Sequence, residues 1–386
     1  MTRMEINIDA LQNNFQVIDK AVRASQSEWC VVAKLLCGFR DGLEALAACG
    51  ARTFADSRLR HLESIREIVP DAETWYLRPP PLSQVRRVVA TCNASLNTEE
   101  AVLVALNQEA TRQGVRHKVI LMAELGERRE GASPEELAGL ATVLTRCPHL
   151  DWVGLGANLG CLHGILPTTE HYAQLKVLRE WLEMKFSHPL PLISAGTSLM
   201  VPGLIEQNPP PEINHYRIGE ILFLGRDLET GKPVARLRQD VFRLFAEIVE
   251  LREKGWSPLG DAMSGISPFA GENKPEGQEG KRGWRALLAV GRLDGELSGL
   301  VPEDPQVQLA GASSDLLAVN LIGDKIRYKV GDCLSFRPDY SSALGLMHSH
   351  YIEKTVLAAE PMTAGGTWRR WLSRQAERLR VRRIFR

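Results

Sequence analysis

Residues 29–56 read WCVVAKLLCGFRDGLEALAACGARTFAD, and the pattern in this stretch recurs along more than half of the chain. Two short β-type runs, Trp29–Lys34 and Thr53–Asp56, flank a stretch that has the apolar spacing of an amphipathic helix. A strand, a helix and a second strand in this order are typical of a parallel βα unit.

The same alternation continues to about residue 223. Eight β-type runs can be counted, and their starts lie about 20 to 40 residues apart, which is enough for a strand, a crossover helix and two short loops. Eight such units close a barrel. The runs are Trp29–Lys34, Thr53–Asp56, Thr74–Leu77, Ala94–Asn97, Lys118–Ala123, Trp152–Ala157, Leu192–Gly196 and Tyr216–Phe223.

The alternation of predicted strands and helices stops after Gly225. Phe242, Leu244, Ala246 and Ile248 lie on one side of an alternating run, and no long helix is expected for about a hundred residues after it. Such alternation is typical of strands with one buried face. Further strands are expected at Trp284–Gly291, Val307–Gly311, Leu316–Ile322, Cys333–Phe336 and His350–Leu357, and Glu5–Ile8 could add an N-terminal strand.

We therefore predict an α/β fold in which a (βα)8 TIM-type barrel is followed by a C-terminal β domain. The predicted barrel spans residues 10–225, the β domain combines residues 1–9 with residues 226–360, and a basic tail occupies residues 361–386. The helices have recognisable starts, because Ser133-Pro-Glu-Glu136 has the form of a capping box with proline at the first helical position.

The composition is that of a globular protein. Of the 386 residues, 44% are hydrophobic and 24% are charged, and the mean hydropathy is −0.16. No apolar run approaches the roughly 18 residues that span a bilayer, and the N-terminus lacks the apolar core of a signal peptide, so a cytoplasmic location is expected. The seven cysteines are odd in number and contain no CxxC pair, which favours reduced thiols over a disulfide framework or a zinc site.

The formal net charge of zero hides a basic C-terminus. From Trp368 to Arg386 there are eight arginines and one acid, Glu377, which gives this segment a charge of +7 and leaves −7 on residues 1–367. A basic amphipathic helix here could touch an anionic membrane surface or nucleic acid. The acidic remainder of the chain favours docking within the chain or its dimer, so neither membrane nor nucleic-acid binding is expected.

In such a barrel the reactive groups lie at the carboxyl ends of the strands. Lys34 ends the first run, where partial desolvation would ease deprotonation of its amine and suit a Schiff base. The plainer interpretation is a lysine that lies along the rim with its ammonium group in water. Gly196-Thr197-Ser198 ends the seventh run and offers amides and a hydroxyl to an anion. Together these two features indicate a cofactor with both an aldehyde and a phosphate.

A set of motifs occurs in a fixed order: Ala33-Lys-Leu-Leu-Cys-Gly38, Ala55-Asp-Ser-Arg58, Ser95-Leu-Asn97, Gly156-Ala-Asn-Leu159, His215-Tyr-Arg-Ile-Gly-Glu220 and Gly311-Ala-Ser-Ser-Asp315. Together they resemble the alanine/ornithine racemase family of fold-type III pyridoxal 5'-phosphate (PLP) enzymes, and most of all its ornithine racemase branch. The resemblance covers roughly residues 4–357. It implies PLP as cofactor, racemisation of a free amino acid, and a homodimer with shared active sites.

The resemblance also implies roles for single residues. Lys34 matches the lysine that forms the internal aldimine with PLP and acts as one catalytic base. Ser198, with backbone amides near Thr197 and Gly219, matches the phosphate cradle, and Tyr340 resembles a tyrosine that reaches the same phosphate.

Three further positions match residues around the cofactor ring. Arg217 matches an arginine that faces the pyridine nitrogen, and a guanidinium cannot accept a proton from that nitrogen. Arg129 matches an arginine near the ring oxygen and the substrate carboxylate. Asn158 occupies the place of a histidine that lies against the ring in classical alanine racemases.

One departure from the family concerns the second catalytic base. Classical alanine racemases place a tyrosine of the partner subunit opposite the lysine in a Ser-Tyr-Gly motif, whereas residues 257–260 here read SPLG. We hypothesise that Asp261, contributed across a dimer, supplies the second acid–base group. Ser313, Ser314 and Asp315 lie in other plausible loops.

Several alternatives remain open from the sequence. Without that tyrosine, a PLP-dependent decarboxylase or aldol lyase is one rival, and a non-catalytic PLP-binding protein is another, although the long β domain argues against the latter. His348 and His350 could present two imidazoles on one strand face, but no third ligand lies nearby and no metal is expected. Cys161 and His163 follow the sixth run in a loop near the expected site. They could face the substrate or be buried, and the buried interpretation is preferred.

Overall fold

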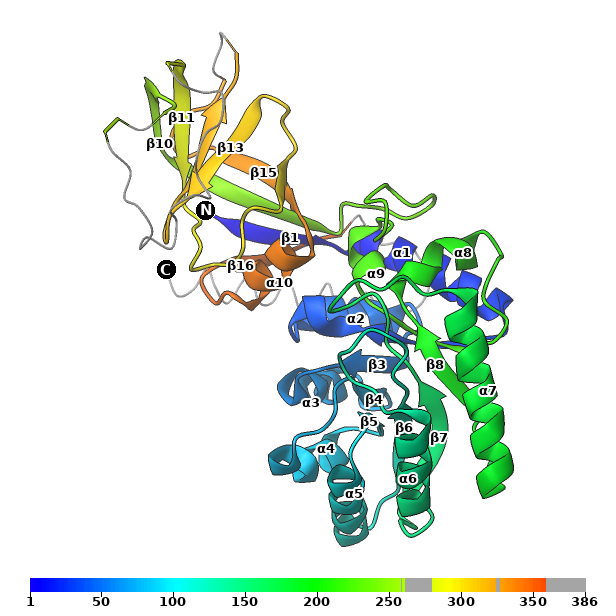
Figure 1. Cartoon of the computed structure of the whole chain (residues 1–386). Helices are drawn as coiled ribbons and strands as arrows, with labels where there is room; N and C mark the ends of the chain where they lie inside the picture. Colours follow the sequence, from blue (N-terminus) through cyan, green and yellow to red (C-terminus); the bar gives the residue numbers. More distant parts are fainter. Residues whose placement is uncertain (258, 261–279, 324–326, 359–386) are drawn as a thin grey trace.

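The computed structural model describes residues 1–257, 259–260, 280–323 and 327–358. It contains a closed barrel of parallel strands alternating with helices, followed by an antiparallel sheet (Figure 1). Both parts of the predicted fold class are therefore confirmed. Among the described residues, no helix is long and apolar enough to cross a membrane.

The barrel consists of eight strands in chain order, and β2 pairs with β9 to close it. This order agrees with the eight β-type runs of the sequence. The strands are β2 (Glu28–Val32), β3 (Thr53–Asp56), β4 (Glu73–Tyr76), β5 (Ala94–Asn97), β6 (His117–Met122), β7 (Leu150–Gly156), β8 (Leu192–Gly196) and β9 (His215–Ile218).

Helices cover the outside of the barrel, and their buried faces follow the apolar spacing of the sequence. On α3, Leu59, Leu62 and Ile65 are buried. At α6, Ser133 and Glu136 form the predicted capping box, with Pro134 in the first turn. The helices are α1 (Ile8–Ala24), α2 (Arg40–Ala48), α3 (Leu59–Ile68), α4 (Val85–Thr91), α5 (Glu100–Gln113), α6 (Pro134–Leu144), α7 (Thr169–Phe186), α8 (Val201–Ile205) and α9 (Glu220–Leu224), with short 3₁₀ turns η1 (Ala33–Leu36), η2 (Leu82–Gln84) and η3 (Ser198–Met200).

Two of the predicted barrel strands run two or more residues past the end of the observed strand. The first was expected to reach Lys34, but β2 ends at Val32 and Lys34 lies in η1. The eighth was expected to reach Phe223, but β9 ends at Ile218 and α9 covers Glu220–Leu224. Both errors have the same cause, because a continuous apolar run does not distinguish a buried strand from the buried helical turn that follows it.

The interior of the barrel is filled with side chains. Trp75 stacks on His215, with ring centroids 4.5 Å apart, and closes part of the interior. At Gly196, an added Cβ would lie 2.0 Å from Cδ1 of Tyr216, so only glycine allows these two strands to approach. Trp75 belongs to an inner apolar cluster whose other buried members are Cys30, Ala55, Leu77, Ala94, Leu96, Ile120 and Met122.

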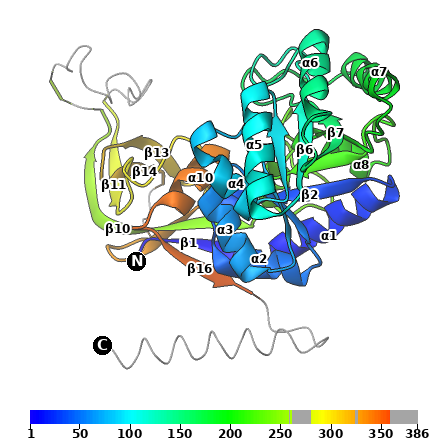
Figure 2. The same cartoon turned by 90° about the horizontal axis from the view of Figure 1, so that it is seen from below.

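The sheet of the β domain has the strand order β12-β15-β10-β11-β14-β13. The N-terminal strand β1 (Arg3–Asn7) is present as predicted, and it pairs antiparallel with β10 and parallel with β16. Figure 2 shows β1 and β16 side by side along one edge of the domain. The other strands are β10 (Phe242–Gly255), β11 (Arg282–Leu288), β12 (Leu300–Pro302), β13 (Val307–Ala312), β14 (Leu317–Leu321), β15 (Cys333–Pro338) and β16 (Glu353–Leu357).

A helix in the β domain, α10 (Tyr340–His348), was not predicted. Its N-cap is Asp339, whose side chain accepts a hydrogen bond from the backbone N–H of Ser342 at 2.8 Å. The helix contacts η1, the turn that carries Lys34. The suggestion that His348 and His350 share a strand face is wrong, because His348 ends α10 and His350 lies in the bend after it.

Candidate active site

Lys34 lies at the end of the barrel at which the parallel strands terminate. It is the second residue of η1, directly after β2, and its side chain is half-buried. Burial lowers the pKa of the Lys34 amine, and the positive charges of Arg129 and Arg217 act in the same direction. Asp56 and Cys161 oppose this shift, so all four groups lie within electrostatic reach of the amine. The amine of Lys34 is therefore more easily deprotonated than that of an exposed lysine.

Arg217 projects from β9 beside β2 and is only 7% exposed. Its Nη1 donates to Oγ of Ser194 at 2.7 Å and to the carbonyl of the same residue, and its Nη2 donates to the carbonyl of Ala157 at 2.8 Å. The guanidinium is thus fixed between β7, β8 and β9. Burial and this neighbouring charge lower the pKa of His215 to about 3, so that the imidazole inside the barrel is neutral.

Arg129, Asn158 and Cys161 meet in the loops after β6 and β7. Arg129 pairs with Glu130, and its Nη1 lies 2.6 Å from Sγ of Cys161. With its oxygen turned toward Arg129, the amide of Asn158 accepts hydrogen bonds from Nη2 at 2.8 Å and from Nη1 at 3.1 Å. In the opposite orientation, the same oxygen lies 3.4 Å from Nη2 of Arg217, so the amide of Asn158 can accept from either guanidinium group but not from both at once.

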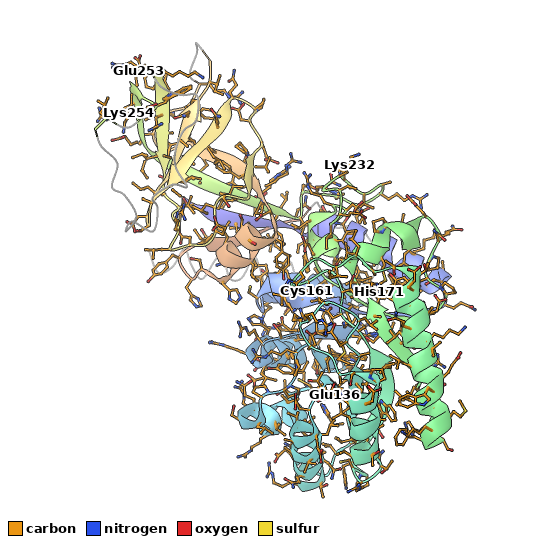
Figure 3. The ribbon with its side chains drawn as sticks, viewed as in Figure 1. Glu136, Cys161, His171, Lys232, Glu253 and Lys254 are labelled. Carbon is orange, nitrogen blue, oxygen red and sulfur yellow. The ribbon has the colours of Figure 1, made fainter. Side chains whose placement is uncertain are left out.

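The interpretation of Cys161 and His163 as buried is wrong, because both residues are exposed. In Figure 3, Cys161 lies at the end of the barrel that is nearer the β domain. The loop that carries these two residues contains Gly160 and Gly164 in left-handed conformations and no regular secondary structure, so it lies over the rim rather than in the core.

A cradle of hydroxyls and amides lies after β8 and β9. Oγ of Ser198 accepts a hydrogen bond from the backbone N–H of Gly219 at 3.2 Å, and a longer one from Ile221 at 3.5 Å. At Gly219, an added Cβ would lie 2.9 Å from Cβ of Val32, so glycine is required there for close packing. Within the described part of the chain, the buried Oγ1 of Thr197 has no hydrogen-bond partner.

Tyr340 reaches the same opening from the β domain. Burial raises the pKa of its phenol to about 12, with further contributions from Glu220, Cys161, Asp56 and Cys37. Asp56 and Cys161 also act on Lys34, which places the phenol and the amine in one electrostatic environment. The sequence-predicted residues Lys34, Arg129, Asn158, Thr197, Ser198, Arg217, Gly219 and Tyr340 are therefore brought to one end of the barrel by η1, η3, β9, α10 and the loops after β6, β7 and β9.

Three acidic residues of this region had no role in the sequence analysis. Asp56 is fully buried at the end of β3, and its carboxylate accepts from the backbone N–H of Arg58 at 2.8 Å and lies 3.1 Å from Nδ1 of His61. The strand-end rule could have found it. Glu127 and Glu220 carry no such signal, because one lies in a loop and the other starts α9.

Two hypotheses about the site stay predictions. Asp261 lies outside the described residues, so the second base has no structural description. Among the described residues, no group of three or more His, Cys, Asp or Glu side chains could hold a metal ion.

The residues of this opening fit a ligand that carries an aldehyde and a phosphate. The partly desolvated amine of Lys34 is suited to bonding with an aldehyde. The Ser198 hydroxyl, the Gly219 amide and the unsatisfied Oγ1 of Thr197 offer polar groups for a phosphate, and a buried hydroxyl without a partner is unusual unless a ligand completes it.

A barrel with a lysine after its first strand, a cradle after its last two strands and an antiparallel β domain is the fold class of the alanine racemases. The alanine racemase of Streptomyces coelicolor has this fold, with a TM-score of 0.70 at 17% identity over 92% of this chain and 98% of that one. Residues 6–227 match the family described as alanine racemase, N-terminal domain, and the chain belongs to that family.

Two characterised relatives cover nearly the whole chain. An ornithine racemase of Acetoanaerobium sticklandii is 33% identical over 357 residues, which is 92% of this chain and 99% of the relative. A lysine racemase of Thermotoga maritima is 30% identical over 354 residues, which is 91% of this chain and 97% of the relative. The resemblance predicted from the motifs is thus confirmed.

Proposed function

We propose that the protein is an amino-acid racemase that uses PLP bound through Lys34. The observation that carries this proposal is the amine of Lys34, which has a lowered pKa and lies at the mouth of the barrel within electrostatic reach of two arginines. The similarity to an ornithine racemase and a lysine racemase along nearly the full chain supports the same reaction class.

Each part of the opening has a task in this reaction. PLP, when bound, supplies an aldehyde and an electron-withdrawing ring that acidifies the α-proton of an amino acid. Ser198, Thr197 and Gly219 would hold its phosphate together with Tyr340. Arg217 would face the ring nitrogen, and because a guanidinium cannot accept a proton, it disfavours protonation of that nitrogen. A weakened electron sink favours rapid return of the proton, as racemisation requires.

Arg129 and Lys34 would act on the substrate itself. The Arg129 guanidinium, held by Glu130, Asn158 and Cys161, can pair with the carboxylate of an amino acid. Lys34 would remove or return the α-proton on one face of the substrate. The opposite face requires a second acid–base group, which we assign to Asp261 of the partner subunit in a homodimer.

The substrate that we propose is a free diamino acid of the ornithine or lysine type. This proposal rests on the two relatives named as ornithine racemase and lysine racemase. A second amino group makes such a substrate longer and more cationic than alanine, so discrimination against alanine is expected.

Incubation of the PLP-loaded protein with each L-amino acid in deuterium oxide tests the reaction. NMR loss of the α-proton signal, together with chiral chromatography of the D form, is expected first for ornithine or lysine. Deuterium uptake without D product would contradict racemisation, and loss of carboxylate or of an aldehyde fragment would identify a decarboxylase or an aldol lyase instead.

A further inference from the structure

The loop of residues 159–165, called the 159–165 loop below, is held by the side chain of Glu127. This carboxylate is 2% exposed and accepts four backbone hydrogen bonds. Oε1 accepts from the N–H groups of Cys161 at 3.0 Å and His163 at 2.7 Å, and Oε2 accepts from Gly160 at 3.0 Å and Ile165 at 3.2 Å.

The four hydrogen bonds determine the charge of Glu127. Burial by itself would raise the pKa of its carboxyl group, but the N–H groups of His163, Cys161, Gly160 and Ile165 outweigh burial, and the pKa is lowered. A carboxylate that accepts several amide hydrogen bonds is stabilised in its ionised form. Glu127 therefore serves the 159–165 loop as a fixed anion with two oxygens, each of which accepts two N–H groups.

The 159–165 loop depends on this anion because its backbone forms neither a helix nor a strand. Its turns are made at Gly160 and Gly164, with φ of +71° and +69°. Without Glu127, four N–H groups of the rim would lose their acceptor. At Gly160, an added Cβ would lie 2.2 Å from Cδ1 of Leu199, so the loop also packs on η3, next to Ser198.

One of the residues bound by Glu127 takes part in a contact of the candidate active site. Its hydrogen bonds fix the backbone of Cys161, whose Sγ lies 2.6 Å from Nη1 of Arg129. Arg129 follows Glu127 by only two residues in the chain, so the residue that fixes the backbone of Cys161 also lies next to the chain segment that carries Arg129. We propose that Glu127 is a positioning residue that sets the orientation of Arg129 toward the substrate carboxylate through the 159–165 loop. The last step, from Arg129 to substrate, rests on the proposed function.

The matched variants are Glu127→Gln, Glu127→Asp and, as a control, Glu136→Gln. Glutamine keeps the shape of Glu127 but loses the charge and places an NH₂ donor against two N–H groups, whereas aspartate keeps the anion. Glu136 also accepts a backbone N–H, from Ser133 at 2.7 Å, but it does so at the exposed start of α6. The labelled positions of Glu136 and Cys161 in Figure 3 lie apart.

The first measurement is hydrogen–deuterium exchange of the full-length PLP-loaded protein, read at the amides of residues 160, 161, 163 and 165. Exchange should be about tenfold or more faster in Glu127→Gln, which corresponds to about 1.4 kcal/mol of lost protection, and close to wild type in Glu136→Gln. The rate at which iodoacetamide alkylates Cys161, relative to its rate at Cys333 in the β domain, should differ from wild type in Glu127→Gln. The same ratio should be unchanged in Glu136→Gln.

The second measurement is steady-state racemisation. Glu127→Gln should raise KM for the amino acid about tenfold with a smaller change in kcat, and Glu127→Asp should recover part of that loss. Unchanged exchange at the four amides would overturn the proposal, as would faster exchange with an unchanged KM. If Glu127→Gln does not fold, amide exchange and KM are compared between Glu127→Asp and wild type instead, and the same outcomes support or overturn the proposal. A wild-type protein that racemises nothing would contradict the proposed function, whereas the exchange result would still decide whether Glu127 holds the loop.

Discussion

At Lys34, burial and two arginines act against the ammonium charge, while Asp56 acts in its favour. The balance lowers the pKa of the amine, so the neutral form persists to lower pH than in a solvent-exposed lysine. Asp56 itself is held by the backbone N–H of Arg58 and by His61, which keeps its carboxylate at the end of β3. The effect of the Asp56 charge on the pKa of Lys34 can therefore be tested separately from the effect of burial.

Replacement of Asp56 by Asn should lower the pKa of Lys34 further, because it removes the largest effect that stabilises the ammonium form. The pKa can be measured in the PLP-free protein from the pH dependence of acylation of Lys34 by acetic anhydride, followed by mass spectrometry. The half-maximal rate is expected at a lower pH than in wild type and in the control Asp71→Asn, which alters an exposed residue. An unchanged or raised midpoint would contradict this account of the site.

Lys34 should also be the residue that bonds to the cofactor. Borohydride reduction of the PLP-loaded protein should attach the cofactor to Lys34, as located by peptide mapping. Lys34→Ala should slow exchange of the substrate α-proton by at least about 10²–10⁴-fold, the usual contribution of a positioned acid–base group. The control Lys20→Ala, at an exposed site on α1, should keep wild-type activity. Labelling of a different lysine would refute the assignment.

Glu220 at the start of α9 should make folding stability depend on pH. Burial, together with Asp339, raises the pKa of its carboxyl group from 4.5 to about 7 in the folded protein. The folded state then binds more protons than the unfolded state, so stability falls as pH rises from about 4.5 to about 7.

The change Glu220→Gln should therefore remove part of this pH dependence and make the PLP-free protein more stable than wild type above pH 7. Urea denaturation between pH 4.5 and pH 8 measures the effect, with the exposed Glu67→Gln on α3 as control. A wild-type free energy of unfolding that does not change over this range would show that the pKa of the Glu220 carboxyl group is not raised. Equal stabilisation by Glu220→Gln and Glu67→Gln above pH 7 would show the same.

At the scale of elements, α10 brings the phenol of Tyr340 to the barrel. Asp339 starts this helix through its hydrogen bond to the N–H of Ser342 at 2.8 Å, and Tyr340 follows it directly. The helix α10 packs on η1, which carries Lys34. The N-cap at Asp339 therefore helps to position Tyr340 relative to Lys34.

Removal of the cap should weaken both folding and cofactor binding. Asp339→Ala should lower the free energy of unfolding by about 1 kcal/mol, the typical value for an N-cap. The same variant should bind PLP more weakly than wild type in a fluorescence titration, because Tyr340 loses its fixed position. Asp339→Asn, which can still cap the helix, should behave like wild type in both assays. A stability loss with unchanged PLP affinity would show that α10 does not position the phenol.

Most of the residues that sequence analysis found lie on or closely after barrel strands, whereas Tyr340, which was found through the resemblance alone, starts α10 in the β domain. Lys34, Asn158 and Arg217 follow from the rule that reactive groups gather at the carboxyl ends of parallel strands, even though the ends of β2 and β9 were misplaced. Glu127 could not be found in this way, because its role depends on N–H groups 33 to 38 residues further along the chain. The helix α10 was missed because its apolar residues continue those of a β-rich region.

For the whole molecule, the central question is whether one chain contains a complete site. In the proposed reaction Lys34 would supply an acid–base group for one face of the substrate, and Tyr340, the cradle and the arginines lie at the same opening. Racemisation needs a group for the opposite face, and we propose that the partner subunit of a homodimer supplies it. Our assignment of Asp261 to this role makes the dimer, rather than the monomer, the active unit.

Subunit mixing tests this assignment directly. Lys34→Ala and Asp261→Asn should each be inactive as homodimers, the second because the proton on one face of the substrate cannot be exchanged. When equal amounts are unfolded and refolded together, half of the dimers should contain one subunit of each kind, and one of the two sites in each such dimer combines an intact Lys34 with an intact Asp261. The mixture should therefore recover about a quarter of wild-type racemase activity, a value that follows from random pairing of two subunits in a closed dimer.

Size-exclusion chromatography with light scattering must show the dimer in all three samples. If Asp261 acted within its own chain, the mixture would stay inactive, because no subunit carries both groups. If Asp261→Asn alone kept its activity, Asp261 would not be the second base.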